Sequence, residues 1–257
     1  MKWRSFHLSL GASPRTFAVR FTAFAAGVLW LVSIPSFATE STCFGTVGNG
    51  SLENGVALPS RGRNFSSYSA TAELLGRTYV HSKVRDVVVA AYKGVEGAAP
   101  DKVFVYGETG WRSGGRIKPH RTHQNGLSVD FMVPVVDKAG RSVPLPTNAL
   151  NRFGYGIEFD AAGRYGEFEI DFPAIAEHLY QLDIAAHAQG IGISLVIFDE
   201  PYLPRLFATA RGPYLKQNLR FMHGKPWVRH DEHYHVDFAV NCKPYAVGAV
   251  PVMKDSE

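Results

Sequence analysis

The chain has 257 residues, of which 46% are hydrophobic and 19% charged, a composition that is ordinary for a folded protein and excludes a largely disordered one. Four of its 27 basic residues and none of its 23 acidic residues lie in residues 1–38. The rest of the chain is therefore neutral overall, which gives no support to nucleic-acid binding, because that function needs a basic face on the folded domain.

Residues 1–38 have the features of a secretory signal peptide. An apolar stretch spans 23–34, Ser36-Phe37-Ala38 offers small residues at the cleavage site, and the basic residues before them are Lys2, Arg4, Arg15 and Arg20. We expect cleavage after Ala38 and no membrane span afterwards. An uncleaved anchor is the alternative, although the apolar stretch is shorter than the about 18 residues that a spanning helix needs.

The remaining residues, 39–257, are expected to form a single domain. The two cysteines, Cys43 and Cys242, lie near its two ends, and an exported chain meets an oxidising compartment. We predict a disulfide between them, which would stabilise the fold by about 4 to 5 kcal/mol on the chain-entropy model. Two buried free thiols are the alternative.

In chain order, 39–69 is rich in Gly, Ser, Asn and Pro and is predicted to be irregular. A helix follows, which Ser82 can cap and Gly94 can end, because its valines recur at helical spacing. Residues 103–106 are predicted to be a buried strand, 108–116 a loop, and 127–135 a second strand.

The second half begins with the turn-rich stretch 136–167, predicted to be loop with room for a strand. Asp171 and Pro173 begin a helix that runs to Gly190. The remaining predicted elements are a strand over 191–198, a partly helical 201–221 broken near Gly212-Pro213, and a last strand over 228–240. This order predicts an α+β fold, with a small, mostly antiparallel sheet that carries the functional site and helices packed alongside.

Five of the ten histidines fall in two short clusters, 120–123 and 230–235. A catalytic zinc takes three imidazole or carboxylate ligands and leaves a fourth position to water. His123, Asp130 and His235 would supply such a set, which predicts a zinc hydrolase. The structural alternatives are histidines that are hydrogen-bonded in the core, or a surface cluster that binds metal without function. The helical zinc-protease motif His-Glu-x-x-His is absent.

The predicted strands bring these residues together. Side chains alternate across a strand, so His233 and His235 point to one face and Tyr234 to the other. A turn at Asn125-Gly126 can return His123 to a place beside Asp130.

These motifs resemble a known family. His-x6-Asp followed far downstream by His-x-His resembles the zinc peptidases that include lysostaphin, the D-Ala-D-Ala peptidases and the hedgehog domain. The closer resemblance is to the penicillin-insensitive murein endopeptidases, and it runs through most of residues 39–257. It rests on Gly114-Gly115-Arg116, His120-x-x-His123-Gln124-x-Gly126-Leu127-x-Val129-Asp130 and His230-Asp231-x-His233-x-His235-Val236.

The resemblance implies a periplasmic enzyme that cuts D-alanyl cross-links between peptidoglycan stem peptides. It implies zinc on His123, Asp130 and His235, with His233 as the base or transition-state donor. His120 matches a histidine that touches a metal in some forms, and His230 one that steadies the intermediate. The chain lacks the family's additional disulfides, and no Asp-x-x-His pair between the clusters supplies the second metal site that such an enzyme can show.

Two arginines in the glycine-rich loop, Arg112 and Arg116, are candidates to bind a stem-peptide carboxylate, because a guanidinium can form two parallel bonds to it. Solvent-exposed loop charges are the alternative. No serine nucleophile is proposed, so we expect insensitivity to β-lactams and sensitivity to chelators.

Other functions remain open. The same zinc chemistry would serve an L,D-type endopeptidase or a D-Ala carboxypeptidase, acting in wall remodelling or with a secretion machine. A zinc-stabilised wall-binding module is an alternative of another class, but a structural zinc would not need a free imidazole such as His233 beside it.

Overall fold

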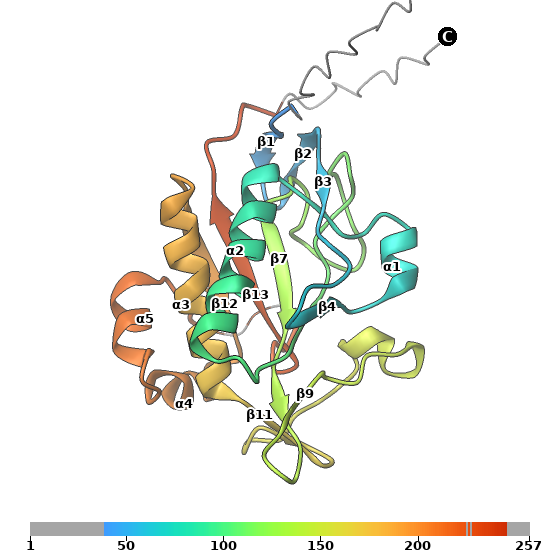
Figure 1. The fold of residues 1–257 in the computed structure, drawn as a ribbon. Helices are drawn as coiled ribbons and strands as arrows, with labels where there is room; N and C mark the ends of the chain where they lie inside the picture. The colour runs from blue at the N-terminus through green and yellow to red at the C-terminus, as the bar shows by residue number, and fades with distance from the viewer. Residues whose placement is uncertain (1–38, 225, 227, 246–257) are drawn as a thin grey trace, which may run out of the picture. The chain divides into compact units, whose positions relative to one another are not determined.

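A five-stranded sheet forms the centre of the molecule in this computed structural model, which describes residues 39–224, 226 and 228–245 (Figure 1). Its order is β12-β13-β7-β6-β4, and only β4 and β6 are parallel. The strands are β4 (Phe65–Ser67), β6 (Phe104–Tyr106), β7 (Ser128–Met132), β12 (Gly192–Ile197) and β13 (His233–Ala239). The predicted α+β fold with a mostly antiparallel sheet is confirmed. The predicted signal peptide, 1–38, lies outside the described residues.

Two long helices, α2 (Ser82–Ala98) and α3 (Phe172–Ala188), lie side by side across one face of this sheet (Figure 1). Tyr234 and Phe131 point to that face, where the Tyr234 hydroxyl lies 2.6 Å from Nδ1 of the buried His178 on α3. Because strand residues alternate, their neighbours His233, His235 and Asp130 point to the opposite face.

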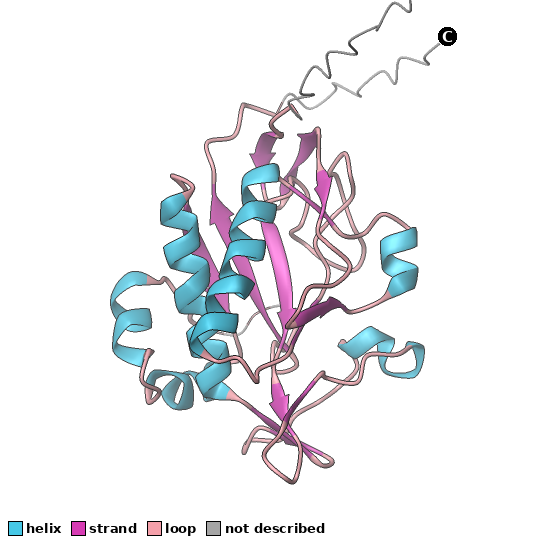
Figure 2. Ribbon diagram, viewed as in Figure 1, coloured by secondary structure: helices cyan, strands magenta, loops and turns pink. Residues whose placement is uncertain are grey.

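Smaller elements surround the sheet (Figure 2). A second sheet has the order β10-β11-β8-β9, and β1 pairs with β2 and β3 with β5. Their bounds are β1 (Thr42–Thr46), β2 (Asn49–Glu53), β3 (Val56–Ala57), β5 (Tyr79–Val80), β8 (Val135–Val136), β9 (Ser142–Val143), β10 (Arg164–Tyr165) and β11 (Phe168–Ile170). The short helices are α1 (Ala70–Leu74), α4 (Leu203–Phe207), α5 (Gly212–Asn218) and the 3-10 turns η1 (Ala149–Gly154) and η2 (Glu200–Tyr202). None of the helices described is long and apolar enough to cross a membrane.

The prediction that 39–69 is irregular is wrong, since four short strands occupy it. The predicted strand 127–135 is divided, because Pro134 cannot donate a ladder hydrogen bond, and β8 joins the second sheet. The predicted strand 228–240 begins only at His233, so His230 lies in the loop before it.

Two helix ends also differ from the prediction. Nδ1 of His81, and not Ser82, caps α2 by accepting from the Lys83 amide at 3.2 Å. Gly94 lies inside α2 and packs against Gln181 of α3, because the buried stripe continues to Val95.

The two predictions for the later helices fare differently. The Asp171 cap of α3 is confirmed by a 3.0 Å bond from the Ala174 amide. Gly212-Pro213 begins α5 where a break was predicted, since proline suits a first helical turn, and the break lies over 208–211.

The predicted disulfide joins Cys43 on β1 to Cys242, just beyond β13. Backbone bonds support the same junction, since the Lys243 amide donates to the Cys43 carbonyl at 2.9 Å. The two ends of the described region are thereby held together.

Candidate metal centre

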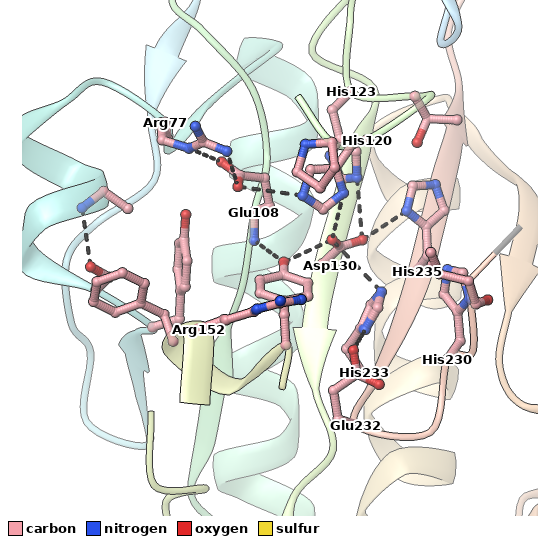
Figure 3. Close-up of a pocket in the computed structure, with 18 of the residues that line it drawn as sticks. Arg77, Glu108, His120, His123, Asp130, Arg152, His230, Glu232, His233 and His235 are labelled. Atoms are coloured by element: carbon pink, nitrogen blue, oxygen red, sulfur yellow. Dashed lines mark hydrogen bonds and ion pairs between the residues drawn. The ribbon is translucent and has the colours of Figure 1, made fainter. Parts of the chain in front are cut away.

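The centre of the site is a residue pair across the β7–β13 ladder. Asp130 and His235 are direct partners in that ladder, so their side chains leave the same face of the sheet side by side. Asp130 Oδ1 and His235 Nδ1 are 2.7 Å apart (Figure 3). Two chain segments far apart in the sequence thus supply a carboxylate and an imidazole to one point.

His123 reaches this point from the loop before β7. Gly126 permits the turn, because a Cβ there would lie 2.8 Å from the His81 amide nitrogen and its φ is +76°. His123 itself has φ of 68°, which is unusual for a residue other than glycine. Its Nε2 lies 3.3 Å from Asp130 Oδ1, so the predicted convergence of His123 and Asp130 is confirmed.

The His123 ring is oriented to present a lone pair to the site. Its Nδ1 donates to the Thr109 carbonyl at 2.8 Å, so Nε2 is the acceptor nitrogen. That Nε2 is buried and has no hydrogen-bond partner. A buried acceptor without a donor is costly, and a metal ion at this position would satisfy it.

His120 lies next to His123, with the two ring centroids 5.0 Å apart. Its Nδ1 lies 3.9 Å from Asp130 Oδ2, and its Nε2 lies 3.5 Å from Glu108 Oε2. His120, His123 and Asp130 offer ligand atoms that all lie within 4.8 Å of one another, and this group could hold a metal ion.

The electrostatics of Asp130 suit a cation. Burial alone would raise its pKa, but His123, His233 and His235 outweigh that effect and hold the pKa well below its usual range. The Tyr155 hydroxyl also donates to Asp130 Oδ2 at 2.8 Å. The carboxylate is therefore ionised and fixed in orientation.

Asp237 supports His235 from behind, a role that the sequence reading missed. Its Oδ1 lies 2.8 Å from His235 Nε2 and accepts from the Ser128 hydroxyl at 2.6 Å. Burial lowers the pKa of His235, but Asp237 and Asp130 outweigh burial and raise it to about 10. The signal was present, because Asp237 continues the alternation of His233 and His235 along one strand face.

His233 lies at the edge of this group. Its Nδ1 is 2.9 Å from Glu232 Oε1, and its Nε2 is 3.8 Å from Asp130 Oδ2. Burial lowers the pKa of His233 to about 4 and raises that of Glu232 to about 8. A neutral imidazole therefore faces the carboxylate, and Glu232 is a second residue that the sequence reading missed.

The ring of His230 packs against the ring of His233. Their ring centroids are 4.6 Å apart, and His230 Nδ1 donates to the Val228 carbonyl at 2.9 Å. Burial lowers the pKa of His230 to about 3, so it too is neutral near pH 7. All five predicted histidines and Asp130 thus line one cavity of about 600 Å³.

The arginines of this cavity are not the predicted ones. Arg112 and Arg116 are exposed and are not among its lining residues, whereas Arg77, Arg152 and Arg229 are. Both arginines of the glycine-rich loop therefore lie outside the cavity lining, which the sequence of the loop alone did not indicate.

Comparison with known proteins adds no assignment. No protein-family model matches the chain, and no curated protein matches it either. Function must therefore be inferred from the site.

Proposed function

We propose that the protein is a zinc-dependent peptidoglycan endopeptidase that hydrolyses D-alanyl cross-links between stem peptides in the periplasm. The observation that carries the proposal is the unpartnered, buried Nε2 of His123, which points at the carboxylate that His235 also contacts. The choice of substrate rests on the resemblance to the murein endopeptidases.

The donor set suits zinc. Two imidazoles and one carboxylate are ligands that zinc takes, and adjacent ligands of a tetrahedral zinc stand about 3.3 Å apart. His123 Nε2 and Asp130 Oδ1 are 3.3 Å apart. We assign His123, Asp130 and His235 as the ligands and place His120 beside them.

Bound zinc would acidify its water ligand and polarise the scissile carbonyl. His233 would accept the proton of the attacking water and pass it to the leaving amine. It is neutral near pH 7 because burial holds its pKa at about 4, and Glu232 fixes the ring with Nε2 turned toward Asp130. His230 packs against His233 and would steady the charge that develops there.

The test is mass-resolved digestion of purified cross-linked muropeptide dimers by the zinc-loaded protein. Wild type should convert dimers to monomers, and chelation should abolish this activity. His233→Ala should retain zinc and lower kcat by about 10²- to 10⁴-fold, because it removes the proton acceptor. His223→Ala, an exposed histidine outside the cavity, is the matched control and should leave kcat unchanged.

The products also separate the alternatives. Fragment masses would reveal an L,D-type endopeptidase or a D-Ala carboxypeptidase if either is correct. Full activity after prolonged chelation would contradict the metal mechanism. Absence of cleavage by folded, zinc-loaded protein would contradict the proposed activity and favour a wall-binding module.

A further inference from the structure

The turn η1 holds Arg152 in a strained conformation at the cavity. Arg152 and Phe153 are consecutive residues with φ of 52° and 57°. The left-handed region costs about 1 kcal/mol or more for a residue other than glycine, and such strain persists only where the surrounding structure imposes it.

Two asparagines impose this conformation. Asn148 Oδ1 accepts from the amides of Leu150 and Asn151, and Asn151 Oδ1 accepts from the amide of Gly154 at 2.9 Å. Phe153 anchors the turn, since its ring meets that of Tyr68 edge to face at 6.4 Å. With Phe153 turned inward, Arg152 is presented to the cavity, and Figure 3 shows its side chain extending from the turn toward the histidine cluster.

Arg152 differs from the other two arginines of the cavity in its charge balance. Arg77 forms two bonds to Glu108, at 2.7 and 2.6 Å. Arg229 pairs with three carboxylates, those of Glu158, Asp199 and Asp231. No residue within the described part of the chain forms a hydrogen bond or ion pair with the Arg152 guanidinium. This exposed cation is therefore available to a ligand.

We infer that Arg152 binds the carboxylate that lies next to the scissile nitrogen of the substrate and thereby selects the type of cross-link. This inference rests on the proposed function. In a D-alanyl cross-link to a diaminopimelate residue, the carbon that bears the scissile nitrogen also bears a free carboxylate. A guanidinium binds such a group with two parallel bonds, whereas an amidated carboxyl group, or lysine in place of diaminopimelate, offers no anion.

The experiment compares two cross-linked muropeptide dimers that differ only in whether this carboxyl group is free or amidated. Zinc-loaded full-length protein should cleave the free form with a kcat/KM on the order of 10- to 100-fold higher, as expected for a charge-assisted bidentate pair. Arg152→Gln should reduce kcat/KM on the free form by that factor and leave the amidated form unchanged. Arg152→Lys should restore part of the preference.

Arg220→Gln is the matched control, because Arg220 is exposed and lies outside the cavity. It should keep the full preference. An Arg152→Gln enzyme that still prefers the free carboxylate would overturn the inference while leaving the endopeptidase intact.

A binding measurement separates this inference from the proposed activity. If wild type cleaves neither dimer, the affinities of both dimers for zinc-loaded protein are measured by calorimetry. Tighter binding of the free form, lost in Arg152→Gln, would support carboxylate recognition without the endopeptidase. Equal affinities would overturn the inference.

Discussion

The His235 imidazole is held between two carboxylates, of which only Asp130 belongs to the predicted ligand set. Asp237 contacts the other ring nitrogen and is itself bonded to Ser128. Carboxylates of this kind orient a ligand and raise its basicity, and their loss typically weakens metal binding by 10- to 100-fold.

Asp237→Asn should therefore weaken zinc binding by about 10-fold or more, because the amide keeps the shape of the side chain and loses its charge. Competition with a fluorescent chelator measures the dissociation constant. Asp101→Asn, at an exposed position, is the control and should bind zinc as wild type does. An unchanged dissociation constant in Asp237→Asn would remove the supporting role.

Single residues were predictable where strand alternation governed them. The common face of His233 and His235 followed from the period of two, and the place of His123 from the Asn125-Gly126 turn. Arg152 could not be predicted, because nothing in its local sequence indicates a left-handed arginine; the asparagine bonds that hold it are visible only in the structure.

At the scale of elements, a buried histidine, His178, lies where α3 packs on the central sheet. His178 is fully buried, stacks on Tyr92 of α2 and contacts the Tyr234 hydroxyl of β13. Burial lowers its pKa to about 3. The ring is thus neutral in the folded protein near pH 7.

This burial predicts a pH dependence of stability. The unfolded chain has the ordinary histidine pKa of about 6.5 and binds a proton more readily than the folded chain, so stability is complete above that pH and is lost as pH falls toward 3. The slope reaches about 1.4 kcal/mol per pH unit for this single group. Urea unfolding of wild type and His178→Asn from pH 7 to pH 4 measures it.

His178→Asn can keep a bond to Tyr234 but does not titrate. The stability of wild type relative to this variant should therefore fall as the pH is lowered. Parallel pH profiles for the two proteins would show that His178 does not titrate on unfolding.

Elements were predictable from periodicity, but their ends were set by tertiary contacts. Gly94 reads as a helix stop in sequence, yet Val95 remains buried and α2 continues to Ala98. The short strands of 39–69 were missed because single pairings, such as β1 with β2, depend on partners that composition does not reveal.

At the scale of the whole molecule, the Cys43–Cys242 disulfide closes a loop with a sequence separation of 199 residues. On the chain-entropy model, a loop of this length stabilises the folded state by about 5 kcal/mol. The free energy of unfolding of the Cys43→Ser/Cys242→Ser protein should therefore be lower than that of wild type by about this amount. Equal urea midpoints and slopes for the two proteins would contradict this prediction.

The direct pairing of Asp130 with His235 would give a bound metal ion a further role, because the binding site would form only when the two strands pair in the correct register. A slip of β13 by one residue would turn Tyr234 toward the face that carries Asp130 and would bury His233 and His235 beneath the helices. A misaligned chain would therefore lose His235 from the proposed ligand set, while His123 and Asp130 stay in place, and would bind zinc more weakly. Zinc binding would thus stabilise the sheet with the native register relative to sheets shifted by one residue. Tight metal binding would then indicate that β13 is paired in the correct register.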